Sequence, residues 1–191
     1  MYKTGGAAVG QAGFMHENTN TTDQADGQPT PAEAAGSSSI TEAAAPSLSA
    51  DPSEPVRFDT KVVVVLRDDL QPWQELNVTA FLMSGIATSG EGLVGENYRD
   101  ADGNDYLPML RQPVMVMTAD ADKLQSIRTK AMGRGIPAAI YTEELFSTGH
   151  DAANRAAVAS VSAEELNLVG VALRGPKNGV DRVVKGARMH A

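Results

Sequence analysis

Short apolar runs separated by polar segments begin near residue 60, and the first run organises the expected fold. Five apolar residues, four of them valines, occupy positions 62–66. A run of this length suits a strand buried on both faces better than a helix. It ends in the charged segment 67–69, and a helical pattern begins at Pro72, which fits the first turn of a helix. A buried strand that leads into a helix is the first half of a βαβ unit.

The helix after this strand is predicted over residues 72–87. Apolar and small residues recur in it at helical spacing, at Trp73, Leu76, Ala80, Phe81, Ser84 and Ala87. Such a stripe normally packs against the rest of the domain, so we expect it to lie on the sheet. Two glycines in the segment 89–92 end the helix.

The remaining pattern predicts one hairpin and several further strands and helices. The hairpin covers residues 93–107 and turns at 100–104, where aspartate, glycine and asparagine gather. Further strands are predicted at 113–117, 137–141 and 168–173. Further helices are predicted after an N-cap at Thr118 or Asp120 and from Pro176, with a helical turn at 142–146 and an irregular or partly helical connection at 148–161. This order predicts a single α/β domain, in which a mixed, mostly four-stranded sheet lies between helices.

Residues 1–56 differ in composition from the rest of the chain. They consist mainly of small residues, polar residues and acids, with few large apolar side chains. Such a segment buries too little surface to offset the loss of chain entropy on folding. We therefore predict a disordered acidic tail over residues 1–56 and a folded domain over residues 57–188.

The net charge of −8 lies mostly in this tail, which holds one lysine against seven acidic residues. The rest of the chain has 15 basic and 17 acidic residues, without the basic excess typical of nucleic-acid binders. Cysteine is absent, which excludes disulfides and cysteine nucleophiles. No apolar run approaches the roughly 20 residues of a membrane span, and no signal-peptide pattern opens the chain. We expect a cytoplasmic protein that does not contact a membrane.

The first candidate site is the corner where the first strand ends, because open α/β sheets bind ligands at the carboxyl ends of their strands. The guanidinium of Arg67 can bind a carboxylate or phosphate through two parallel hydrogen bonds. Asp68 is a second ligand-binding candidate, and Asp69 is a candidate catalytic carboxylate. The structural alternative is an Arg–Asp pair with one aspartate as the N-cap of the helix. Asn77, further along this helix, faces either the ligand or solvent.

The second candidate site is the polar stretch 142–155. His150 is a candidate general base here, with Glu143 as a candidate carboxylate. The ligand-binding candidates of this stretch are Thr142, Thr148 and Asn154. The alternative is structural, because a histidine beside an aspartate in a loop is often a local capping group. No Gly-x-Ser-x-Gly nucleophile motif is present.

No metal or cofactor is expected. Asp100, Asp102 and Asn104 have the spacing that opens a calcium loop, but its sixth position is Asp105 instead of glycine and its twelfth is Arg111 instead of glutamate. A tight hairpin turn is the better interpretation. No glycine-rich phosphate loop follows the first strand, so a nucleotide cofactor is not expected either.

On these segments the chain resembles the type-2 peptidyl-tRNA hydrolases. Residues 61–70 are similar to that family's first strand and its Arg-Thr-Asp-Leu ending. Residues 120–141 are similar to its second helix and its Gly-Leu-Pro-Thr strand, and residues 168–176 to its closing strand. The stretches 142–155 and 173–176 bear a closer similarity to an uncharacterised bacterial family on that fold, a domain of unknown function. The resemblance implies a type-2 peptidyl-tRNA hydrolase-like fold and a homodimer.

The chain departs from the hydrolases where their catalytic residues lie. They carry a catalytic lysine after the first strand, whereas residues 71–77 of this chain contain no lysine. Residues 141–144 replace their Arg-Asp-Ala-Gly segment, and only Glu143 or Glu144 could supply its carboxylate. We therefore predict a non-catalytic module that binds a small molecule or a protein partner. The alternative is a small hydrolase that acts on an anionic ester or amide through Arg67, a carboxylate and His150.

Overall fold

The computed structural model describes residues 55–191, so all but the last two residues of the predicted tail lie outside it. The described residues form an α/β domain with a five-stranded mixed sheet in the order β5-β6-β1-β4-β7. The strands are β1 (Thr60–Arg67), β4 (Val114–Ala119), β5 (Ala138–Thr142), β6 (Leu168–Pro176) and β7 (Arg188–Met189). The expected four strands are present. The mostly four-stranded prediction omitted β7, because a strand of two residues leaves no alternating pattern.

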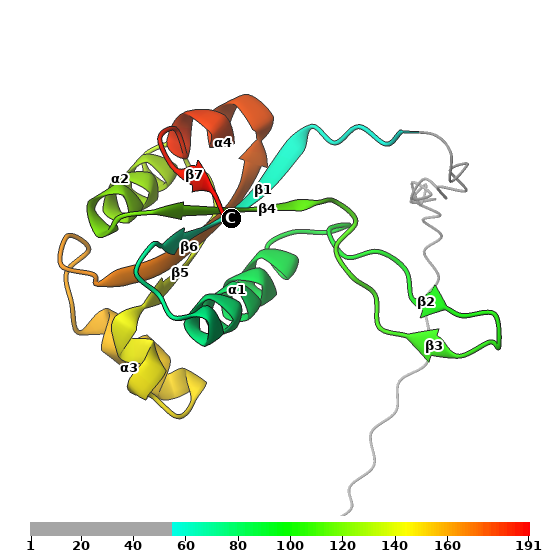
Figure 1. Cartoon of the computed structure of the whole chain (residues 1–191), viewed down its shortest axis with the longest axis horizontal. Coiled ribbons are helices and arrows are strands. Elements are labelled where there is room, and N and C mark those ends of the chain that lie inside the picture. Colours follow the sequence, from blue (N-terminus) through cyan, green and yellow to red (C-terminus); the bar gives the residue numbers. More distant parts are fainter. Residues whose placement is uncertain (1–54) are drawn as a thin grey trace, which may run out of the picture. The chain divides into compact units, whose positions relative to one another are not determined.

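Helices cover both faces of this sheet (Figure 1). The helix α1 (Pro72–Ala87) lies on one face, and α2 (Ala121–Met132) and α4 (Lys177–Val183) lie on the other. A 3-10 helix, η1 (Glu143–Ser147), and the helix α3 (Asp151–Ala159) follow β5. The connection at 148–161 is therefore more regular than its sequence suggested. No helix within residues 55–191 is long and apolar enough to cross a bilayer.

The strand β1 is the centre of the fold, as its sequence predicts. It pairs in parallel with β4 and antiparallel with β6. Its five apolar residues from Val62 to Leu66 are at most 1% exposed. Val63 and Val65 pack in the core beneath α2 and α4, whereas Val62, Val64 and Leu66 pack beneath α1. A strand with two buried faces carries apolar residues at every position, which explains the unbroken run.

The face of α1 that packs on the sheet is not the predicted one. Val78, Leu82 and Ile86 are buried against the sheet, whereas Trp73 and Leu76 of the predicted stripe are 60% and 74% exposed. The close approach of α1 to the sheet depends on Gly170 of β6. A Cβ atom at Gly170 would lie 2.5 Å from Cγ1 of Val78 and 2.9 Å from Cδ1 of Leu82.

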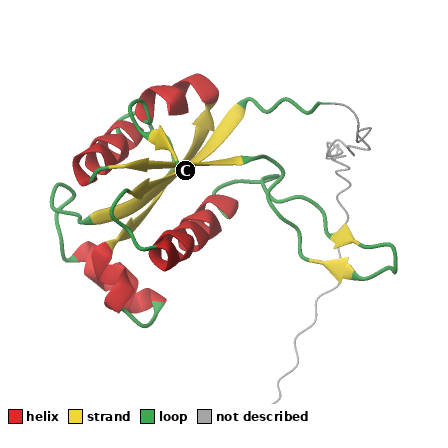
Figure 2. Ribbon diagram, viewed as in Figure 1, coloured by secondary structure: helices red, strands yellow, loops and turns green. Residues whose placement is uncertain are grey.

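The hairpin formed by β2 (Tyr98–Arg99) and β3 (Asp105–Tyr106) projects away from the sheet (Figures 1 and 2). Its turn is organised by Asp100, whose carboxylate accepts hydrogen bonds from the side chains of Asn104 and Tyr106 and from two backbone N–H groups. These bonds lower the pKa of Asp100 to about 2. The prediction of a polar hairpin turn is confirmed.

Candidate functional site

The predicted corner lies at one edge of the sheet, where several segments meet. The parallel strands β1 and β4 end side by side, with Arg67 opposite Ala119. The end of β5 and the start of β6 reach the same edge, because Thr142 pairs with Leu168 and Gly170 pairs with Leu66. The polar residues that follow β1, β4 and β5 are therefore brought together, although they are far apart in the sequence.

Arg67 is the centre of a polar cluster at this edge. Its Nε donates to Asp69 Oδ1 at 2.6 Å, its Nη1 to Asn167 Oδ1 at 2.9 Å and its Nη2 to Glu143 Oε2 at 2.5 Å. Only 12% of its side chain is exposed. Partial burial by itself lowers the pKa of Arg67, but the bonds to Asp69 and Glu143 outweigh this effect and raise it above the ordinary value. The guanidinium therefore stays charged.

This cluster joins three of the predicted site residues, Arg67, Asp69 and Glu143. Every nitrogen of the guanidinium is already engaged by a side chain of the protein. A guanidinium has five N–H groups, so two of them remain for a ligand, but an anionic ligand at Arg67 would also be repelled by the carboxylates of Asp69 and Glu143. In this arrangement Arg67 holds the two carboxylates and ties β1 to η1. The Arg–Asp pair of the structural alternative is present, but the N-cap of α1 is Gln71 and not an aspartate.

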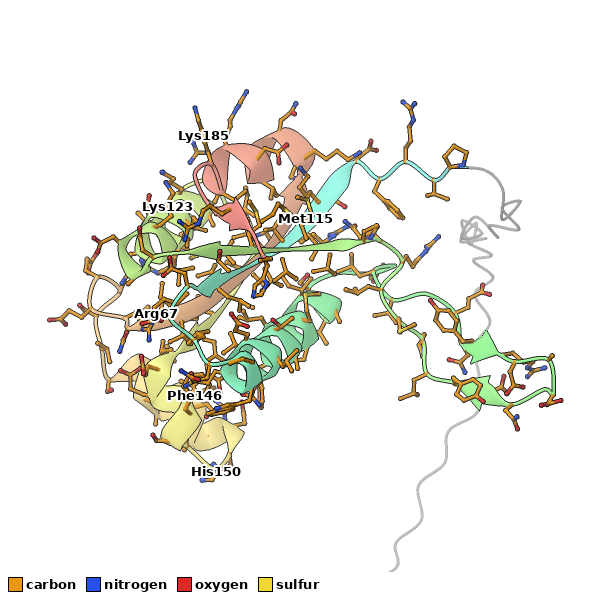
Figure 3. All side chains as sticks on the ribbon, viewed as in Figure 1. Arg67, Met115, Lys123, Phe146, His150 and Lys185 are labelled. Atoms are coloured by element: carbon orange, nitrogen blue, oxygen red, sulfur yellow. The ribbon has the colours of Figure 1, made fainter. Side chains whose placement is uncertain are left out.

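The other polar residues of the stretch 142–155 lie apart from this cluster. His150 is exposed and caps α3, and its Nδ1 accepts a hydrogen bond from the backbone N–H of Ala153 at 3.2 Å. Among residues 55–191, its ring makes no hydrogen bond to a carboxylate. Figure 3 shows His150 well separated from Arg67. Thr148 donates to the side chain of Asn154 in the same local structure.

Two further predicted site residues, Asn77 and Thr142, contribute to the packing of the domain. Asn77 accepts a hydrogen bond from the hydroxyl of Tyr141 at 3.1 Å, which links α1 to β5. Thr142 is only 1% exposed, and its hydroxyl has no hydrogen-bond partner among the described residues. Asp68 makes no hydrogen bond to Arg67 among the described residues and instead accepts from Nη2 of Arg188 in β7 at 2.9 Å.

Asp68 and Arg188 line a polar recess of about 430 Å³ between the end of β4, the start of α2 and the turn before β7. The lining residues are Asp68, Thr118, Ala119, Asp120, Asp122, Lys123, Ser126, Gly186 and Arg188. Asp120 is the N-cap of α2 and accepts from the backbone N–H of Lys123 at 2.8 Å. Thus Asp68 and Asp120 each have a partner within the protein.

The ammonium group of Lys123 is different, because no carboxylate pairs with it among the described residues. It lies over Gly186, where an added Cβ atom would be 2.8 Å from Nζ. Lys123 also lies in the first turn of α2, where the helix dipole disfavours a positive charge. Its charge therefore does not serve the stability of the helix.

The chain matches the profile described as "Protein of unknown function (DUF2000)" over residues 60–191. It belongs to the DUF2000 family. The DUF2000 domain is also similar to the solved structure of a protein of unknown function from Agrobacterium tumefaciens, with 49% sequence identity and a TM-score of 0.69. That match covers 71% of this chain and 100% of the other. No curated protein matches the chain. The expected relation to a family of unknown function is confirmed, whereas the type-2 peptidyl-tRNA hydrolase resemblance stays a prediction.

The recess of the DUF2000 domain contains Lys123 and Arg188, which sequence reasoning missed. The recess combines residues from three segments, near positions 68, 118–126 and 186–188. The third segment was not recognised because β7 has only two residues. One signal was available in the sequence, a lysine three residues after the N-cap candidate Asp120, where a helix normally favours an acidic residue.

Proposed function

We propose that the DUF2000 domain of this chain is a non-catalytic module that binds a small charged ligand in the recess beside Lys123. The observation that carries the proposal is the ammonium group of Lys123, which pairs with no carboxylate of residues 55–191 and lies at the carboxyl edge of the parallel strands β1 and β4. Open α/β sheets bind ligands at this edge. The volume of about 430 Å³ is that of a pocket for a small metabolite.

The lining of the recess favours a ligand with groups of both signs. An anionic group of the ligand would meet the Lys123 ammonium and the N-terminal end of α2, both of which attract negative charge. The carboxylate of Asp122 lines the same recess and would attract a cationic group. A zwitterion such as a free amino acid has both groups within one small molecule.

The hydrolase alternative is supported by one observation, the pair of carboxylates that Arg67 holds together. A general base must lie within about one hydrogen bond or one water of its partner. His150 instead caps α3, so a mechanism that pairs it with Asp69 or Glu143 would require this helix terminus to move. A binding role requires no such movement, and we therefore rank it first.

The proposal is tested with a thermal-shift screen of the full chain against free amino acids, dicarboxylates and inorganic phosphate. Each compound that raises the melting temperature is then titrated by calorimetry into the wild type and into two variants. Lys123→Met removes the charge in the recess, and Lys130→Met is the matched control. Lys130 lies in the last turn of α2 and does not line the recess. We expect a hit that raises the melting temperature of the wild type and of Lys130→Met. Its dissociation constant should be at least tenfold higher for Lys123→Met.

Two results would contradict the proposal. The first is that no compound of the panel shifts the melting temperature of the wild type. The second is a hit that binds Lys123→Met and the wild type equally well, because the ligand would then lie elsewhere on the domain.

A further inference from the structure

A second surface of the domain, separate from the recess, is formed by the outer side of α1. Trp73, Leu76, Ala80, Met83 and Ala87 follow one another at alternating spacings of three and four residues. This spacing is that of the contact seam between two packed helices. The buried side of α1 is formed by other residues, Val78, Leu82 and Ile86. Most of the seam therefore faces away from the sheet; Met83 also packs against the core beneath α1, and one edge of Trp73 packs on the ring of Phe146.

The seam is apolar and carries no charge. Trp73 and Leu76 are 60% and 74% exposed, Ala80 is exposed, and Met83 and Ala87 are half-buried. Glu75 is the only charged residue of α1, and it lies within 3.1 Å of the His190 ring instead of in the seam. A helix on a protein surface normally turns charged residues towards solvent. The outer side of α1 thus has the composition of a contact surface.

The seam ends at an apolar groove of about 460 Å³ beside the hairpin. Met83 and Ala87 belong to both the seam and the groove. The rest of the groove is formed by Val94, Tyr98, Pro108, Met109, Leu110, Gln112 and Val114. One end of the seam therefore carries the largest side chain, Trp73, and the other end opens into a hollow.

We propose that two copies of the chain form a dimer in which their α1 helices pack antiparallel about a two-fold axis at Ala80. In this register Trp73 of each copy lies opposite Ala87 of the partner subunit and fills its groove. Leu76 lies opposite Met83 of the partner subunit, and the small Ala80 lets the two helices approach at the axis. Each large residue meets a small or flexible one, so the same surface complements itself, as a two-fold interface requires.

The available area is sufficient for such a dimer. Large side chains that are about half exposed present on the order of 100 Å² each. The seam and the exposed groove residues Val94, Tyr98 and Met109 together offer roughly 600 Å² per copy, at the lower limit of stable interfaces. The chain outside the described residues is a weaker candidate, because residues 1–54 contain few large apolar side chains. The absence of charge in the seam also disfavours a charged partner.

The test is the mass of the full chain in solution over a range of concentrations, measured by sedimentation. We expect twice the chain mass of 20.0 kDa. Ala80→Glu places two like charges at the axis and should raise the dissociation constant of the dimer at least a hundredfold. Met132→Glu introduces the same charge at an exposed apolar residue of α2 and should leave the dimer unchanged. Because both positions are exposed, circular dichroism should show that both variants are folded.

Two further measurements test the register. Trp73 is the only tryptophan, so its fluorescence should shift to shorter wavelength as the concentration rises and the groove of the partner covers it. The chain has no cysteine, so Ala80→Cys should form a covalent dimer with a short bis-maleimide, whereas Met132→Cys should not. A monomeric wild type would overturn the proposal and leave the seam to a different partner. A dimer that Ala80→Glu does not weaken, or an Ala80→Cys chain that does not cross-link, would overturn it as well.

Discussion

The helices α1 and α2 cover opposite faces of the same sheet but differ in what they present to solvent. Each buries a narrow apolar stripe, Val78, Leu82 and Ile86 in α1 and Leu124, Ile127 and Ala131 in α2. The remaining surface of α2 includes four charged residues, whereas α1 has a single charge and an exposed apolar seam. Packing on the sheet therefore covers the apolar stripe of α2, and Met132 at its end is the one large apolar side chain of this helix that is exposed. The same packing leaves α1 with a second apolar surface, which the described chain covers only in part, through the packing of Trp73 on Phe146 and of Met83 against the core.

The largest expected effect on stability separates two leucines on opposite sides of α1, one on its buried side and one in the exposed seam. Leu82→Ala removes a side chain that is 1% exposed and should lower the free energy of unfolding by about 2–5 kcal/mol. Leu76→Ala removes one that is 74% exposed and should change it by less than about 0.5 kcal/mol. Urea unfolding followed by circular dichroism, at a protein concentration low enough to exclude dimers, measures both. Equal losses in the two variants would mean that the assignment of the inner face is wrong.

The same contrast explains which parts of the fold the sequence could predict. In α2, charged residues separate the apolar positions, so the buried residues Leu124, Ile127 and Ala131 stand out in the sequence. In α1, apolar residues lie around most of the helix, and periodicity favoured the more prominent stripe with Trp73 and Leu76. The true inner face depends on Gly170, which is about 90 residues further along the chain and leaves room for Val78 and Leu82. A contact of this kind has no local signature.

The candidate site could also be predicted only in part from the sequence. The strand end at Arg67 was recognised because an apolar run meets charged residues there. Its partners Glu143 and Asn167 come from other strands, and only Glu143 was proposed. His150 was proposed from its residue type, but its role at the start of α3 depends on the local backbone. Lys123 and Arg188 could not be combined before the position of β7 was known.

A smaller effect is expected at the N-terminal end of α2, which also forms a wall of the recess. Asp120→Ala removes the side chain that accepts from the backbone N–H of Lys123. Loss of an N-cap should lower the free energy of unfolding by about 1 kcal/mol. Asp120→Asn keeps an acceptor at this position and should restore most of that loss. If both variants were as stable as the wild type, the N-terminal turn of α2 would not depend on this cap.

The smallest effect concerns the only charge of α1. The backbone oxygen of Ala191 and the carboxylate of Glu75 raise the pKa of His190 above its ordinary value of 6.5. The folded chain therefore binds this proton more tightly than the unfolded chain does. The resulting stabilisation is fully present below about pH 6.5 and is lost as the pH rises through the raised pKa. Because the pair is partly exposed, it should amount to less than about 1 kcal/mol.

Urea unfolding at pH 5.5 and at pH 8.5 measures this contribution of His190. The wild type should be slightly more stable at the lower pH than His190→Gln, and the two should agree at the higher pH. His150→Gln should keep the pH dependence of the wild type, because the His150 ring bonds the backbone N–H of Ala153 and not Glu75. If the free energy of unfolding of His190→Gln changed between pH 5.5 and pH 8.5 as much as that of the wild type, another group would be responsible for the pH dependence. The single charge of α1 would then contribute nothing to holding the C-terminal segment against the helix.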